Sequence, residues 1–146
     1  MGRYSDIRQT INSQAQSFGL YIDHRISEAG ISQLFNYVAE RGDVYVFSGI
    51  IRNFLLGYLE NRDIDFVISM RETLNIPIRF LRGSTITKNK FGGVKIQKNG
   101  FNIDVWNIGS TWSVDTRKGI SSPYSLLKTA FFNFSSIVYD YNKRKF

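Results

Sequence analysis

Two aspartates separated by a single residue, Asp63 and Asp65, are the residues of this chain best suited to catalytic chemistry. They begin the segment DIDFVISM, residues 63–70, which we expect to form a strand. On a strand both carboxylates project from one face, about 7 Å apart along the chain, while Ile64 and Phe66 point into a core. Two like charges on one face repel each other unless a cation lies between them, and Mg²⁺ prefers carboxylate and phosphate oxygens. The pair therefore predicts a site for Mg²⁺ (or Mn²⁺), although exposed strand ends also carry such pairs with no function.

A third carboxylate, Asp104, follows the same alternation in a second segment that we expect to be a strand, residues 101–108. Phe101, Ile103 and Val105 share one face of this segment, so Asp104 projects from the other. Three acids on neighbouring strands could hold a metal pair that activates an attacking hydroxyl and neutralises a triphosphate. We therefore predict that Asp63, Asp65 and Asp104 are catalytic metal ligands.

The turn at Ser48 and Gly49 could bind the phosphates of a nucleotide. It ends a short apolar segment, residues 44–47, and opens a stretch with helical spacing of apolar residues. Backbone N–H groups at the start of a helix favour anions, and Arg52 adds a positive charge within the first turn. We predict that Ser48, Gly49 and Arg52 contact a bound NTP. The alternative is an ordinary strand-to-helix turn with a surface arginine.

These motifs together resemble a known family. The stretch VYVFSGIIRNFLLGYLENRDIDFVIS, residues 44–69, resembles the head-domain motif of tRNA nucleotidyltransferases and bacterial poly(A) polymerases. That motif runs roughly V-Y-x-V-G-G-x-V-R-D-x-L-L-G, a short spacer, and then D-x-D. The stretch FGGVKIQKNGFNIDVWNI, residues 91–108, is similar to the hairpin that follows in the family. The likeness covers residues 30–108 well and 123–140 loosely, and implies the catalytic head fold of the DNA polymerase β-type nucleotidyltransferase superfamily.

The resemblance implies an enzyme that transfers NMP from an NTP, such as ATP, to an acceptor, which we expect to be an RNA end. The sequence departs from the family at Ser48, at Asn53, where the family has Asp, and at residues 129–136, where TAFFNFSS replaces R-R-D-F-T-I-N-A. The chain also stops where the helical neck and body of the family begin, so we expect an acceptor other than the tRNA CCA end.

Two further interpretations stay open. The chain could be a nucleotide- or RNA-binding module that retains the fold without turnover, as the missing Arg pair of R-R-D-F-T-I-N-A suggests. It could also act with a second protein chain, for instance in a toxin–antitoxin or defence pair that modifies a protein or a tRNA.

Helices are expected first in the chain, and a mixed sheet with further helices after them. One helix starts near Ser5, with Ile7, Ile11, Ala15 and Phe18 on one face, and a second carries Ile31, Leu34, Phe35 and Val38 and ends at Gly42. Strands are expected at 44–47, 63–70, 94–97, 101–108 and 136–141, a turn at Asn99-Gly100, and a helix from Ser122-Pro123 to Phe131. This order predicts an α/β (α+β) fold with one domain over residues 1–146.

The charge of the chain points to polyanionic partners. The formal net charge is +7, and between Glu72 and Asp104 there is no acidic residue. We predict that lysines of this interval bind an RNA or another polyanionic acceptor; they are Lys88, Lys90, Lys95 and Lys98. The alternative is a solvated surface. No apolar run reaches the roughly 20 residues of a membrane span, and the first residues lack the apolar region of a secretory signal, so we expect no membrane association and a soluble, cytoplasmic protein.

Overall fold

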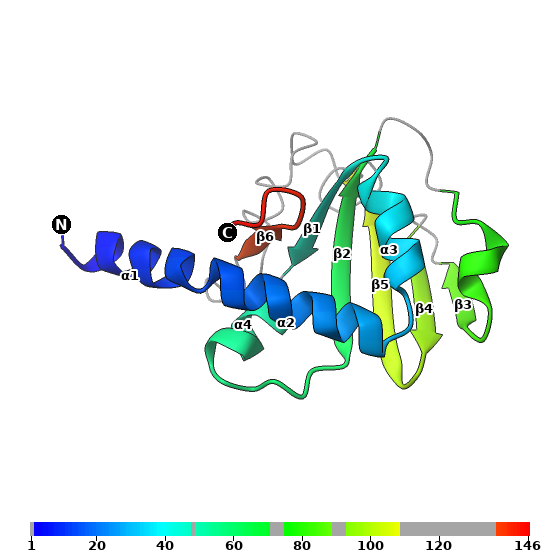
Figure 1. Cartoon of the computed structure of the whole chain (residues 1–146), viewed down its shortest axis with the longest axis horizontal. Coiled ribbons are helices and arrows are strands. Elements are labelled where there is room, and N and C mark those ends of the chain that lie inside the picture. The colour runs from blue at the N-terminus through cyan, green and yellow to red at the C-terminus, as the bar shows by residue number, and fades with distance from the viewer. Residues whose placement is uncertain (1, 48, 71–74, 89–92, 109–136) are drawn as a thin grey trace.

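A mixed β-sheet runs through the protein, and the described helices that join its core pack against one face of that sheet (Figure 1). The structure is a computed structural model that describes residues 2–47, 49–70, 75–88, 93–108 and 137–146. Its strands are β1 (Asp43–Phe47), β2 (Asp63–Ser69), β3 (Thr85–Lys88), β4 (Val94–Lys98), β5 (Phe101–Asn107) and β6 (Val138–Asp140). Its helices are α1 (Gly2–Ser13), α2 (Ala15–Glu28), α3 (Ser32–Ala39), α4 (Gly49–Leu55) and the 3₁₀ helix η1 (Ile78–Leu81). The α/β class predicted from the sequence is confirmed.

The strands lie in the order β3-β4-β5-β2-β1-β6. The central pair, β2 and β5, is parallel, whereas β1 pairs antiparallel with both β2 and β6, and β4 pairs antiparallel with both β3 and β5. The two strands that carry the predicted metal ligands are therefore hydrogen-bonded neighbours in the middle of the sheet.

Side-chain alternation gives the sheet two different faces. Toward α2, α3 and α4 it presents a continuous apolar layer that includes Val46, Ile64, Phe66, Ile103 and Val105, and these pack with the buried residues of the helices. The opposite face carries a smaller apolar cluster at one end. That cluster contains Tyr45, Val67, Ile108 and Val138, with Phe47 and Trp106 packed against it. The remainder of this second face is where the polar residues of β2, β4 and β5 project.

The first two helices differ in part from the prediction. Helix α1 begins at Gly2, so Ser5 lies inside the helix and does not cap it. The helix is interrupted at Gln14 and continues as α2 to Glu28, well beyond Phe18, the last residue of the predicted apolar face. Of the predicted apolar face, Phe18 is fully buried, but Ile7 is 54% exposed because α1 extends beyond the sheet (Figure 1).

Helix α3 matches its prediction except at its end. Leu34, Phe35 and Val38 are buried as expected, but the helix is capped at Glu40 in right-handed conformation, and Gly42 is not its left-handed cap. A Cβ added at Gly42 would lie 2.5 Å from the backbone oxygen of Ser69. Gly42 is therefore required for close approach of the chain to the end of β2.

The hairpin between β4 and β5 has the predicted turn. Asn99 and Gly100 have φ values of +49° and +76°, as expected of a two-residue turn with both residues left-handed. The edge strand β3 was not expected, because its four side chains are all exposed and show no buried alternation. The predicted helix from Ser122 to Phe131 lies outside the described residues, and the last predicted strand is confirmed over Val138–Asp140.

Among the residues that the structure describes, no helix is long and apolar enough to cross a membrane.

Candidate active site

Three carboxylates project from the face of the sheet that points away from the helices. In the parallel pair of β2 and β5, Asp65 lies directly beside Asp104 and Asp63 directly beside Asn102. Their strand neighbours Ile64, Ile103 and Val105 belong to the helix-side core, which fixes the direction of the acidic side chains. The structure thus places the three aspartates singled out in the sequence on one face of two paired strands.

Asp65 has the least favourable position of the three for a negative charge. Burial of the carboxyl, followed by the charges of Asp104 and Asp63, raises its pKa from 3.8 to about 6, against a lowering effect of Lys95. The structure shows no hydrogen bond from a described residue to the Asp65 side chain. A cation beside Asp65 would relieve both the burial cost and the repulsion.

The outer two carboxylates each have a partner from the neighbouring strand. The Asn102 side-chain amide donates a 2.9 Å hydrogen bond to Asp63 Oδ1, and Lys95 Nζ lies 3.9 Å from Asp104 Oδ2. Among the described residues, no group of three or more acidic or histidine side chains is arranged so that it could hold a metal ion in this conformation. The donor set suits a hard divalent cation by its chemistry: three carboxylates on two paired strands, the middle one without a hydrogen-bond partner among the described residues.

The turn after β1 lies at the same end of the sheet as the acids. Phe47, the last residue of β1, pairs with Asp65, and α4 begins two residues later at Gly49. A Cβ added at Gly49 would have Arg52 Nη2 as its nearest neighbour, at 3.9 Å, so the guanidinium group lies close to this turn. Arg52 also donates to Asn53 Oδ1 from Nε and Nη2, at 3.2 and 3.1 Å. Ser48 lies outside the described residues.

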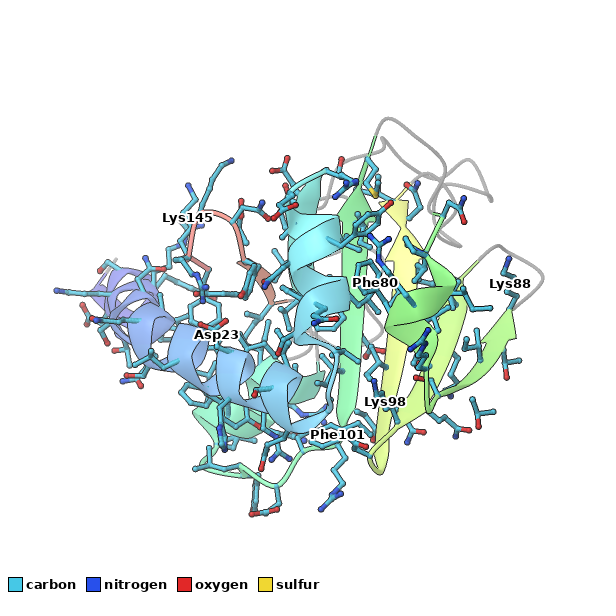
Figure 2. All side chains as sticks on the ribbon, turned by 45° about the vertical axis from the view of Figure 1, so that its right-hand side comes forward. Asp23, Phe80, Lys88, Lys98, Phe101 and Lys145 are labelled. Carbon is cyan, nitrogen blue, oxygen red and sulfur yellow. The ribbon has the colours of Figure 1, made fainter. Side chains whose placement is uncertain are left out.

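The four predicted acceptor-binding lysines are not gathered on one surface. Lys95 pairs with Asp104 and shares its face, whereas Lys98 follows the opposite alternation, and its side chain lies beside Gly30 at the end of α2. Lys88 pairs with Val94, whose side chain belongs to the helix-side core, and stands at the outer end of β3, away from Lys98 (Figure 2). Lys90 lies outside the described residues. Only Lys95, of the three that the structure describes, stands beside the acids.

Arg25, which the sequence analysis did not single out, anchors the chain just before the acidic strand. Its buried guanidinium donates from Nε to the backbone oxygen of Asn61, at 3.0 Å, with a second bond from Nη2, and pairs with Glu28. The Asn61 side chain in turn accepts a 3.2 Å hydrogen bond from the backbone N–H of Asp63. No local pattern marks the anchoring role of Arg25, because the carbonyl of Asn61 lies 36 residues further along the chain.

Replacing Arg25 by methionine should therefore destabilise the protein. The Asn61 carbonyl would lose a charged donor and Glu28 its partner, which we expect to lower the free energy of unfolding by about 2–3 kcal/mol. Urea denaturation of the metal-free chain measures this change. The control is Arg8→Met, at an exposed site on α1; equal stability of the two variants would contradict the anchoring role.

Comparison with known proteins places the fold. No protein-family model matches the sequence, and no curated protein matches it. Solved structures do match. The Thermotoga maritima CCA-adding enzyme complexed with tRNA matches with a TM-score of 0.55 and 23% identity, over 85% of this chain and 27% of that one. A tRNA-processing enzyme with CTP matches at 0.54 and 16%, over 80% and 29%.

A further CCA-adding enzyme, in complex with CTP, matches with a TM-score of 0.53 and 21% identity, over 85% of this chain and 28% of that one. The chain thus spans less than a third of the length of each of these proteins. Identities this low establish the fold and leave the activity to be tested. The chain has the nucleotidyltransferase fold that forms one part of CCA-adding enzymes.

Proposed function

We propose that this protein is a metal-dependent nucleotidyltransferase, which transfers NMP from an NTP to an acceptor hydroxyl at an RNA end. The observation that carries the proposal is the cross-strand pairing of Asp65 with Asp104, with Asp63 on the same face and the β1–α4 turn beside them. The fold shared with CCA-adding enzymes, some of them solved with CTP or ATP, supports it.

The proposed reaction exchanges one bond at the α-phosphorus for another, and the residues of the site hold the metal and the phosphates. The acceptor oxygen forms a bond to the α-phosphorus of the NTP, the bond to the β-phosphate oxygen breaks, and pyrophosphate leaves as the hydroxyl loses its proton. Asp63, Asp65 and Asp104 would hold Mg²⁺ or Mn²⁺, which, when bound, neutralises the triphosphate and activates the hydroxyl. Arg52 would pair with the phosphates, and Gly49 would allow the backbone to approach them.

RNA is the acceptor that we favour. The formal net charge of +7 attracts a polyanion, and Lys95 stands on the same face as the carboxylates. One of the similar structures is a CCA-adding enzyme complexed with tRNA. An RNA 3′ end that enters across β4 would pass Lys95 before it reaches the acids.

A screen with labelled nucleotides tests the proposed function. The chain is incubated with each labelled NTP in turn, with Mg²⁺ or Mn²⁺, and with total RNA or cell lysate, and the products are separated by size. We expect transfer of one nucleotide type to RNA, which EDTA prevents. Nucleotide binding without transfer under any condition would support a non-catalytic module instead. Transfer only after addition of a co-purifying polypeptide would support action with a second protein chain.

Two lysines on one strand test how the acceptor binds. Lys95→Gln should raise the acceptor KM more than the NTP KM and reduce the dependence of acceptor binding on salt, because a phosphate contact is lost on the acid face. Lys98→Gln is the matched control, since Lys98 lies on the same strand but on the helix side. Kinetics at about 50 and 200 mM salt measure both effects. Equal KM changes in the two variants would show that net charge, and not the position of Lys95, holds the acceptor.

A further inference from the structure

A row of amide side chains leads across three strands to Asp63. Gln97 of β4 pairs with Asn102 of β5, which pairs with Asp63 of β2. The Gln97 amide Nε2 donates to Asn102 Oδ1 at 3.0 Å, and the Asn102 amide Nδ2 donates to Asp63 Oδ1 at 2.9 Å. The two hydrogen bonds run in one direction, from the outer strand toward the proposed metal site.

The chemistry of the three groups fixes this direction. An ionised aspartate can only accept hydrogen bonds, so Asn102 must present its NH₂ group to Asp63. The Asn102 oxygen then faces Gln97, which must donate to it. Each side chain thus determines the orientation of the next.

The row matters because Asp63 is an exposed residue whose carboxylate would otherwise rotate freely. The Asp63 backbone N–H is already fixed by the Asn61 side chain. The hydrogen bond from Asn102 to Oδ1 restrains the carboxylate as well, and Oδ2 has no hydrogen-bond partner among the described residues. That oxygen is available to a cation.

We propose that Asn102, oriented by Gln97, is a positioning residue that sets the Asp63 carboxylate for metal binding. The proposal rests on the proposed function, because it assigns Asp63 to the metal. Side chains that orient metal ligands typically account for a 10- to 100-fold difference in affinity or activity. Asn102 touches Asp63, whereas Gln97 touches neither Asp63 nor the site and acts only through Asn102.

Titration of the metal-free, 146-residue chain with Mn²⁺, with free Mn²⁺ followed by electron paramagnetic resonance, tests the proposal. Asn102→Ala should weaken Mn²⁺ binding by at least about tenfold, with little change in melting temperature, and Gln97→Leu should weaken it by less. The control is Thr85→Ala, because Thr85 lies one strand further out in the same row and its side chain is exposed. Unchanged Mn²⁺ affinity in Asn102→Ala, with the fold intact, would overturn the proposal.

Gln97→Glu separates orientation from charge. A glutamate cannot donate to Asn102, but it can accept from the Asn102 NH₂ group and so compete with Asp63. If the orientation of the Asn102 amide controls the site, Gln97→Glu should bind Mn²⁺ more weakly. The added negative charge by itself would make Mn²⁺ binding stronger. Tighter Mn²⁺ binding in Gln97→Glu would overturn the proposal that Gln97 orients Asn102.

The binding data also separate this proposal from the proposed function. Mn²⁺ binding that depends on Asn102, in a chain that transfers no nucleotide, would support the positioning role and contradict the enzyme activity. Nucleotide transfer that is unaffected by Asn102→Ala at limiting Mn²⁺ would retain the enzyme and overturn the positioning role. If the unsubstituted chain binds no Mn²⁺, both proposals are wrong.

Discussion

Asp65→Asn is expected to abolish nucleotide transfer and, in the metal-free protein, to increase stability at neutral pH. Asp65 is the middle carboxylate of the three, beside Asp104 and two residues from Asp63. An asparagine keeps the shape of the side chain but cannot share a divalent cation as a charged ligand. The loss of activity should exceed the roughly 10- to 100-fold effect of removing a partner outside the ligand set.

The stability gain follows from the raised pKa of Asp65. The folded protein binds the Asp65 proton more tightly than the unfolded chain, with a pKa of about 6 against 3.8. Stability of the metal-free protein should therefore fall as the pH rises from about 4 to about 6, and stay reduced above that range. The difference of about two pH units, at about 1.4 kcal/mol each, sets an upper limit of about 3 kcal/mol. Asp65→Asn removes this pH dependence, so we expect a gain of about 1–3 kcal/mol at pH 7.5 and none at pH 4.

Urea denaturation in EDTA, at pH 4 and at pH 7.5, measures this effect. Asp63→Asn is the matched control: it should also abolish transfer, but its stability should change little because Asp63 is exposed. Adding Mg²⁺ should stabilise the unsubstituted chain and not Asp65→Asn, since a ligand stabilises only the state that binds it. Full activity in Asp65→Asn, or a loss of stability at pH 7.5, would remove Asp65 from the site.

The acidic strands could be predicted from the sequence because their information is local. In DIDF and FNID every second residue is apolar, so alternation alone determines which side chains face the core and which face away. The same alternation places Asn102, two residues before Asp104, on the same face. The contact of Gln97 with Asn102 could not be predicted in this way, because it depends on the register of β4 against β5.

Other features depended on contacts between distant parts of the chain. Gly19 lies inside α2, and a Cβ at this position would lie 2.7 Å from the Tyr139 hydroxyl, so the packing of α2 against β6 requires the glycine. The absence of acidic residues between Glu72 and Asp104 suggests a single basic surface. The pairing of β3, β4 and β5 instead places Lys95 on one face and Lys98 on the other.

The remaining large effect concerns the β1–α4 turn. Gly49→Val is expected to remove NTP binding while the protein still folds. The described part of the fold does not require glycine here: φ is not positive, and among the described residues an added Cβ would meet only Arg52 Nη2, at the ordinary contact distance of 3.9 Å. Valine at the start of a helix costs less than about 1 kcal/mol in propensity. Any requirement for glycine would therefore come from a ligand that approaches the backbone.

Titration with a fluorescent NTP analogue, together with melting temperatures, measures the effect of Gly49→Val. A branched side chain would occupy the space that we assign to the phosphates, so we expect no saturable binding, whereas the smaller Gly49→Ala should retain weakened binding. Arg52→Ala should lower NTP affinity more than Mn²⁺ affinity, because the guanidinium lies beside the turn and the cation is held by the aspartates. If Gly49→Val binds the NTP as tightly as the unsubstituted chain, the turn is structural only, and the nucleotide must bind elsewhere on the acidic face.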